Sequence, residues 1–363
     1  VRDLGLEIID VCMDSNLVET GATLVEVIKS QTLDFPAAMS IDSFDVEALG
    51  KAMEVYPGRA IVNSISLEEV EPGLDKIDAV LEKTLHHAPV YIVLLTGPEG
   101  PAVTVEKKEE LARLVFEKVT KKYDIKPEQL LFDINAFPIG SEPEPGLNFS
   151  VESIQSIPKI KALHPDVKTI IGVGNLTAGL AKKPYMRRVL TSVFLDEARK
   201  MGLDAAIVNP NHYVPVDSLP DTDYALGRKV VLEHDMDAFS ELEEIALAKK
   251  GVIKKKAVSY DQLAPIEAVC AKIKDGYKER GQDSVTIGEH TFEYHDRIVL
   301  QVSELIREMD PLGMINQHLM PAMEELGDGF AAGNVSLPHL LKSADVMKHV
   351  MGFLESYMKR ISG

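Results

Sequence analysis

The stretch AIVNSIS, residues 60–66, is an apolar, β-branched run that ends in polar side chains, and the amphipathic stretch 68–87 follows it. A strand followed by a helix of this kind is the unit from which parallel sheets are built. Similar runs occur six more times between residues 7 and 210, as EIIDVCM (7–13), AAMSID (37–42), VYIVLLT (90–96), QLLFDIN (129–135), TIIGVGN (169–175) and AAIVNP (205–210). The pattern predicts an α/β fold with seven parallel strands.

Seven strands are one short of a closed eight-stranded barrel. Residues 105–123 and 186–202 carry apolar side chains at three- and four-residue spacing and are predicted to be helices between strands. The alternative, a doubly wound open sheet, usually binds a nucleotide through a Gly-rich turn, and TIIGVGNLTAG offers only G-x-G. We therefore predict a TIM-type (β/α)8 barrel whose first strand is apparently missing. Val1–Leu6 looks like the last turn of a helix closed by Gly5, so we expect further sequence upstream.

Composition restricts the partners of the chain. A formal net charge of -18 over 363 residues works against binding to nucleic acid, because that binding depends on Lys and Arg. The two cysteines, Cys12 and Cys270, lie far apart and predict neither a disulfide nor a metal site. No apolar run is long enough to span a bilayer, so we expect a cytoplasmic protein without membrane contact.

The second part of the chain has a different pattern. Residues 212–256 are polar and end in the lysine-rich AKKGVIKKKAV, which indicates a surface connection with a domain boundary near residue 255. Four helical patterns without a strand candidate follow, at 261–281, 291–309, 311–333 and 337–361. We predict a barrel at 1–215, a linker at 216–256 and an all-α four-helix bundle at 257–363.

Polar residues stand where the predicted strands end. Catalysis in barrels is located at these carboxyl ends, and Asp and Asn are poor strand residues. Each of them alone could equally cap a helix or form a turn. Together they predict a rim of carboxylates and amides with almost no cations, which suits a neutral ligand rich in donors, such as an aminopyrimidine ring. The rim residues are Asp10, Asp42, Asn63, Ser64, Asp133, Asn135, Asn175, Asn209 and Asn211.

The series IDS, VNSIS, FDIN, GVGN and IVN resembles the pterin-binding barrel shared by cobalamin-dependent methionine synthases and methyltetrahydrofolate:corrinoid methyltransferases. The resemblance covers nearly all of residues 1–215, and VNSIS is its most specific part. It implies that the chain binds 5-methyltetrahydrofolate as substrate.

The resemblance also implies roles for single residues. Asp42, Asn63 and Asp133 would hold the pterin ring, with Asp10 and Asn209 on the same rim. Asn175 would lie beside N5 and be the catalytic residue, since an Asn that bonds better to protonated N5 lowers the barrier to methyl transfer. Arg187 would contact the tail of the ligand, although an arginine on a solvated helix face is equally expected.

This sequence departs from the family pattern at several places. FDIN replaces FDP, GVGNLT replaces GxSNVS and DVCMD replaces DVNxD, and the strand with the motif GER[TI]N is absent. The absence of that strand would leave the barrel open and remove part of the pterin site, while the substitutions affect substrate detail.

Residues 310–355 resemble the helical cap that precedes the cobalamin-binding domain in methionine synthase and related corrinoid proteins. The resemblance implies that Phe330 and Leu337, with Leu340 nearby, cover the upper face of the corrin ring. The alternative is that these residues belong to the bundle core, which we also expect of the methionines at 314, 320, 323, 347 and 351. We do not expect His339 to bind cobalt.

The resemblance implies further partners. The cobalt ligand of the family comes from D-x-H-x-x-G in a Rossmann-like domain, and that motif and the zinc cysteines for homocysteine are absent. We expect both domains to act in trans or to be missing from this chain.

Taken together, the residues and the resemblance favour a methyltransferase that passes the N5-methyl group of 5-methyltetrahydrofolate to cob(I)alamin during methionine synthesis from homocysteine. One alternative is a non-catalytic pterin- or corrinoid-binding module. Dihydropteroate synthase is a weaker alternative, because its Gly-rich loop is missing and the rim lacks the cations that a pyrophosphate leaving group needs.

Overall fold

The computed structural model describes residues 6–34, 37–142, 146–180, 182–249 and 260–361. The chain divides into two compact units. The first comprises Val1–Phe137, Glu144–Leu176 and Arg188–His234, and the second comprises Pro138–Pro143, Thr177–Arg187 and Asp235–Gly363. The helical turn predicted at the amino end lies, except for Leu6, outside the described residues.

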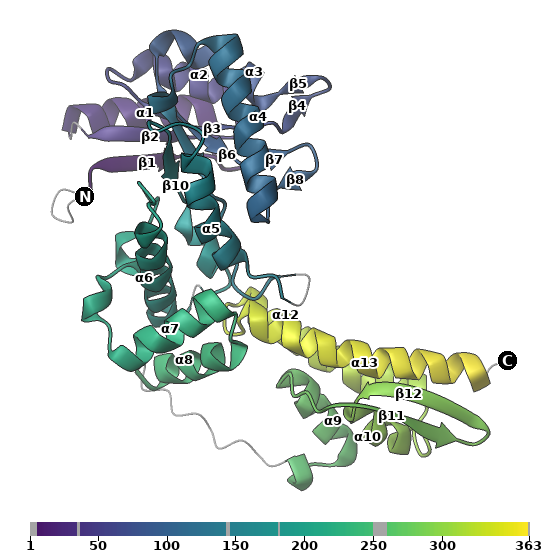
Figure 1. Ribbon diagram of the computed structural model, residues 1–363. Coiled ribbons are helices and arrows are strands. Elements are labelled where there is room, and N and C mark those ends of the chain that lie inside the picture. The colour runs from purple at the N-terminus through teal and green to yellow at the C-terminus, as the bar shows by residue number, and fades with distance from the viewer. Residues whose placement is uncertain (1–5, 35–36, 143–145, 181, 250–259, 362–363) are drawn as a thin grey trace. The chain divides into compact units, whose positions relative to one another are not determined.

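A parallel six-stranded sheet forms the centre of the first unit (Figure 1). Its strands, in sheet order, are β1 (Ile8–Cys12), β2 (Ala38–Asp42), β3 (Ile61–Ile65), β6 (Val90–Leu94), β9 (Leu130–Asp133) and β10 (Lys168–Ile170). The seventh predicted strand, residues 205–210, is reduced to a parallel bridge between Gly172 and Ile207. The α/β class is confirmed, but within the described residues the sheet is a half-barrel and not a closed barrel.

Side chains alternate between the two faces of these strands, because the β period is two residues. One face lines a cavity of about 280 Å³ with apolar side chains from five strands and the bridge, namely Ile8, Ile61, Ile92, Leu131, Ile170 and Ile207, together with Ser40 of β2. Residues two positions further along the same strands point the same way. The inner face therefore carries the polar residues that follow this apolar layer.

Helices follow the strands of the first unit and pack in chain order, α1 on α2, α2 on α3 and α4 on α5. They are α1 (Thr20–Asp34), α2 (Val46–Val55), α3 (Lys76–Thr84), α4 (Val105–Tyr123), α5 (Phe149–Lys161), α6 (Pro184–Lys200, whose first residues belong to the second unit) and α7 (Asp221–Glu233). The side chains of Asp45, Thr104 and Asn148 cap the amino ends of α2, α4 and α5.

The helix predicted at 68–87 begins later than expected. Its first part forms a hairpin of β4 (Glu69–Glu71) and β5 (Leu74–Asp75), in which Gly73 has a φ of 79°. The proline and glycine between these strands favour the turn over a helix. A second small hairpin, β7 (Thr96–Gly97) with β8 (Gly100–Pro101), follows β6.

The polar stretch predicted as a connection contains α7 and α8 (Met236–Lys249). Their apolar side chains, at helical spacing, are buried, as Val230 and Val231 in α7 and Phe239 and Leu242 in α8 show. The high proportion of charged residues hid this spacing in the sequence. The boundary predicted near residue 255 lies outside the described residues.

The carboxyl-terminal part of the second unit is not the all-α bundle that we predicted. Its helices are α9 (Pro265–Lys274), α10 (Ile298–Leu305), α11 (Pro311–Met314), a π-helical turn (Ile315–Leu319), α12 (Met320–Ala331) and α13 (Leu337–Ile361). Between α9 and α10 lies an antiparallel hairpin, β11 (Arg280–Ile287) and β12 (His290–Asp296). In β12 every second side chain is buried, namely Phe292, Tyr294 and Asp296. This two-residue period, which is typical of a half-buried strand, was missed.

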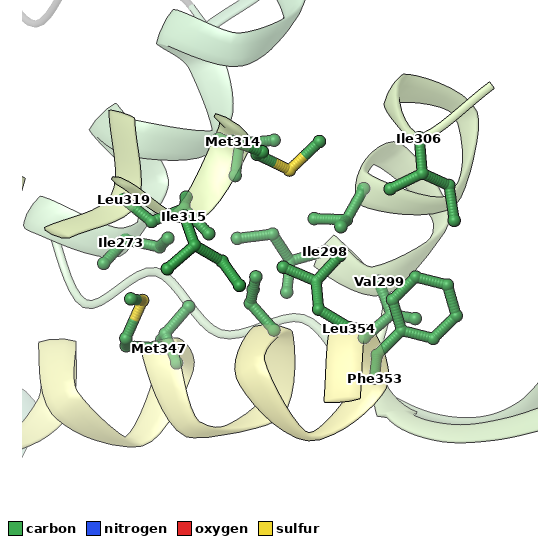
Figure 2. Packing of buried hydrophobic residues seen from close by; sticks show 14 of the residues in the cluster. Ile273, Ile298, Val299, Ile306, Met314, Ile315, Leu319, Met347, Phe353 and Leu354 are labelled. Carbon is green, nitrogen blue, oxygen red and sulfur yellow. The ribbon is translucent and has the colours of Figure 1, made fainter. Parts of the chain in front are cut away.

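A hydrophobic core joins these elements (Figure 2). Figure 2 shows Ile273 of α9, Ile298 of α10 and Leu354 of α13 pointing into a common interior with Met314 and Met347. Met314 is fully buried, Met323 and Met351 pack against the cluster, and Met320 is 43% exposed. Core packing is therefore the role of most of these methionines. No helix of the described residues is long and apolar enough to cross a membrane.

Candidate functional site

The carboxyl ends of the inner strands bring together the polar residues predicted from the sequence. The sheet register pairs Cys12 with Asp42, and Asp42 with Asn63. Asp10 lines the cavity directly, and Asp133 lies two residues beyond the lining residue Leu131 on the same face. Four predicted rim residues, Asp10, Asp42, Asn63 and Asp133, thus share the inner face of one sheet.

Asp133 is the most buried carboxylate of this rim, with 7% of its surface exposed. Its Oδ1 accepts a hydrogen bond from the backbone N–H of Asn135 at 2.8 Å, and its Oδ2 accepts one from Gly172 at 3.3 Å. Burial raises its pKa to about 6. Each oxygen keeps a second lone pair, so the carboxylate can accept further bonds from a ligand.

Asn135 makes its hydrogen bonds within the protein and supports the Asp133 carboxylate. It adopts a left-handed conformation with a φ of 54°, which Asn tolerates better than most residues. Its Nδ2 donates to the carbonyl of Leu95 at 2.9 Å, which fixes the side chain. The predicted rim residue Asn135 is therefore engaged within the protein.

Asp42 belongs to a group of three neighbouring carboxylates. Burial, followed by the charges of Asp10 and Asp14, raises the pKa of Asp42 to about 6. Asp14 accepts hydrogen bonds from the Ser43 hydroxyl at 2.7 Å and from the N–H of Phe44 at 2.6 Å. It thereby connects β1 to the loop after β2. This negative potential suits a ligand that presents N–H donors.

Two buried lysines lie close to the rim, which was predicted to have almost no cations: Lys76 is beside it, and Lys108 lies in the helix layer behind it. Lys76 is 4% exposed, its Nζ lies 3.4 Å from the Ser64 hydroxyl, and burial lowers its pKa. Lys108 is fully buried. A signal for Lys108 existed in the sequence, because it shares the apolar stripe of α4 with Leu111 and Val115, where a solvated lysine would be out of place.

The other predicted pterin residues lie outside this group. Asn175 is exposed on a 3₁₀ turn, Val173–Thr177, that follows β10. Asn209 is also exposed, and its side chain accepts from the N–H of Asn211 and caps a short helical turn. Arg187 donates to the Thr177 hydroxyl at 3.3 Å, and burial lowers its pKa, so the arginine is more than a solvated surface charge.

The predicted corrin cap lies where α12 ends and α13 begins. Phe330, Leu337 and Leu340 are each half-buried, in contrast to core residues such as Leu354. Partly exposed apolar side chains at one helix junction fit contact with the flat apolar face of a large ring. His339 bonds through Nε2 to the Lys274 carbonyl at 2.8 Å, and so holds α13 to α9. Among the described residues, no group of three or more His, Cys, Asp or Glu side chains could hold a metal ion.

Comparison with known families agrees with both halves of this description. Residues 1–209 match the family of pterin binding enzymes, and residues 295–355 match the B12 binding domain family. The first match covers more than half of the chain, so the chain belongs to the pterin-binding enzyme family. The two matches support the predicted folate substrate and cobalamin cofactor.

The chain is also similar to two curated proteins. It is 27% identical to the methionine synthase of Mycobacterium tuberculosis over 98% of its own length, and 27% identical to that of Mycobacterium leprae over 98%. It spans only 29% and 28% of those proteins. The resemblance to methionine synthase that the motifs predicted is thus confirmed.

The solved structures to which the chain is similar include two dihydropteroate synthases. The enzyme of Yersinia pestis with a pterine-sulfa conjugate is 15% identical, with a TM-score of 0.40 over 69% of this chain and 85% of that one. The enzyme of Xanthomonas albilineans with 4-aminobenzoic acid is 16% identical, with a TM-score of 0.40 over 71% of this chain and 82% of that one.

Proposed function

We propose that this chain binds 5-methyltetrahydrofolate at the inner rim of its half-barrel and takes part in passing the N5-methyl group to cob(I)alamin, during methionine synthesis from homocysteine. The observation that carries the proposal is the set of carboxylates and an amide on one sheet face, in a chain that matches both a pterin-binding and a B12-binding family.

Asp133 is the proposed anchor of the pterin ring. Its backbone bonds fix both oxygens and leave lone pairs for the N–H and NH2 groups of the aminopyrimidine edge. Asp42 and Asn63, adjacent in the sheet register, would hold a second part of the ring. Burying the Asp133 carboxylate costs free energy. Hydrogen bonds donated to it by the ligand would offset this cost, which favours the complex.

Asn175 is the proposed catalytic residue. Methyl transfer from N5 requires that this nitrogen gain positive character, because a neutral N5 would have to leave as an amide anion, which is a poor leaving group. A side-chain amide that bonds more strongly to protonated N5 stabilises the transition state over the ground state. Asn175 is exposed on a turn and so could reach a bound substrate. Arg187 is the proposed contact to the acidic tail.

Cobalamin, when bound, supplies a cobalt nucleophile that accepts the methyl group. Phe330 and Leu337, with Leu340, would hold one face of the corrin ring and exclude water from it. The cobalt ligand and the zinc site for homocysteine would come from other domains. The greater length of the curated relatives, of which this chain spans 29% in one case, agrees with this proposal.

Methyl transfer can be tested by mixing the chain with cob(I)alamin and 5-methyltetrahydrofolate and following tetrahydrofolate formation. We expect turnover with the unaltered chain and a loss of about 10²–10³-fold in Asn175→Ala, the usual cost of removing one hydrogen-bonding group that stabilises the transition state. Binding without any transfer would instead support the non-catalytic binding module, which the open sheet makes a specific alternative.

A further inference from the structure

Lys108 of α4 is a fully buried lysine with few partners. Its Nζ donates one hydrogen bond, to the hydroxyl of Ser153 on α5 at 2.8 Å, and lies 5.7 Å from the centre of the Phe137 ring. Burial lowers its pKa to about 7. A side chain that serves only packing would be apolar here, because burying an ammonium without an ion pair is costly.

A continuous chain of hydrogen bonds leads from Lys108 to the candidate site. The Ser153 hydroxyl accepts from Lys108 and donates to the carbonyl of Asn135 at 2.7 Å. The N–H of Asn135 in turn donates to Asp133 Oδ1 at 2.8 Å. Every member of this chain is buried, so each contact acts with little screening by water.

In the part of the protein that the structure describes, few charged groups surround this chain of hydrogen bonds. Facing Lys108 are the carboxylates of Glu152 on α5 and Asp133 on β9. Glu152 is already bonded to the backbone N–H of Val105 at 2.6 Å. Lys108 is the cation whose charge lowers the pKa of Asp133 and opposes the effect of burial.

We propose that Lys108 is a positioning residue for Asp133: from the helix layer, its ammonium keeps the Asp133 carboxylate ionised and, through Ser153, holds the 133–135 segment in the form that accepts the ligand. The role of Asp133 as ligand anchor rests on the proposed function above, whereas the electrostatic link between Lys108 and Asp133 does not. The two can therefore be tested apart.

The direct test is the titration of Asp133 followed by carbon NMR of labelled aspartate carboxyls, with the resonance assigned through Asp133→Asn. Lys108→Met keeps an unbranched side chain out to the ε position and removes the charged amine. We expect it to raise the midpoint of the Asp133 titration by on the order of one pH unit, the effect of one charge several ångströms away in a protein medium. An unchanged midpoint in a folded Lys108→Met variant would overturn the proposal.

Matched variants separate charge from packing. Lys107→Met alters the neighbouring lysine, whose Nζ pairs with Glu110 at the surface at 3.1 Å, and should leave the Asp133 midpoint unchanged. Ser153→Ala keeps the Lys108 charge but breaks the hydrogen-bond chain. It should weaken 5-methyltetrahydrofolate binding severalfold without the upward shift of the midpoint that Lys108→Met produces. A similar upward shift in Lys107→Met would show a general effect of helix charge and refute a specific role.

The binding measurement distinguishes the two proposals. If the unaltered chain binds no 5-methyltetrahydrofolate but Lys108→Met still shifts the Asp133 titration, the link stands and the proposed function fails. If the chain binds the folate and the pH profile of its affinity is the same in Lys108→Met, the positioning role fails and the proposed function stands.

Discussion

Lowering the pH from 8 to 5 should release the folate, because two carboxylates of the site have raised pKa values. Burial brings Asp133 to about 6, and burial with the charges of Asp10 and Asp14 brings Asp42 to about 6. A protonated carboxyl loses the charge and one acceptor position that the N–H groups of the pterin require. Ordinary aspartates remain ionised throughout this range.

The size of the effect follows from these values. At pH 5 a carboxyl with a pKa of about 6 is ionised in roughly one molecule in eleven, so its protonation weakens binding about tenfold. Two independent carboxyls would weaken it about a hundredfold. Isothermal titration between pH 5 and 8 measures this change in Kd. Folic acid, whose N5 is an aromatic nitrogen, serves as a second ligand that separates titration of the protein from titration of the substrate amine.

Stability should respond to pH in the opposite direction. A carboxyl whose folded pKa lies above its unfolded pKa stabilises the fold below the unfolded value and loses this contribution as pH rises through the folded value. For Asp133, from 3.8 to about 6, this loss is about 2 kcal/mol between pH 4 and 7. Urea unfolding of the chain and of Asp133→Asn at both pH values gives this contribution as a difference. For the binding prediction, a folate Kd that stays constant between pH 8 and pH 5 would refute the reasoning.

Three further predictions concern other parts of the chain. Phe292→Ala should destabilise the carboxyl-terminal core by about 3–5 kcal/mol in urea unfolding, because the buried Phe292 ring packs on the Phe353 ring with 5.7 Å between the ring centres. A cost below about 1 kcal/mol would show that the hairpin is not part of that core. Asn209→Ala should cost about 1 kcal/mol, the value of a helix cap, and leave folate affinity unchanged, so a large loss of affinity would restore Asn209 to the site. Phe330→Ala should slow methyl transfer to cob(I)alamin in a protein that still folds, because it removes a partly exposed ring from the end of α12; equal rates would remove it from the corrin cap.

The positions of six strands could be predicted because each is a short apolar run with polar ends. The same reasoning placed Asp42, Asn63 and Asp133 on one face, since strand ends in a parallel sheet meet at one edge. The β11–β12 hairpin was missed because its alternating residues lie between helical patterns and were assigned to them.

The buried lysines could not be predicted with the same ease. A lysine in a helix is normally solvated, and only the coincidence of Lys108 with the apolar stripe of α4 indicated burial. Lys76 carried no such signal, because the hairpin before α3 was itself predicted as helix. The sequence left open whether Asn209 caps a turn or contacts a ligand, and the cap could be recognised only from the position of the Asn211 N–H, which donates to Asn209 Oδ1.

The central claim is that the inner rim binds 5-methyltetrahydrofolate through Asp133, and equilibrium binding to the chain and to Asp133→Asn at pH 7.5 tests it most directly. Asp124→Asn, an aspartate on the surface next to Lys126, is the matched control. The account predicts binding by the unaltered chain and the control, and a loss of about 10²-fold or more in Asp133→Asn, the value of a charge-assisted pair of hydrogen bonds. Equal affinity in all three proteins would contradict it.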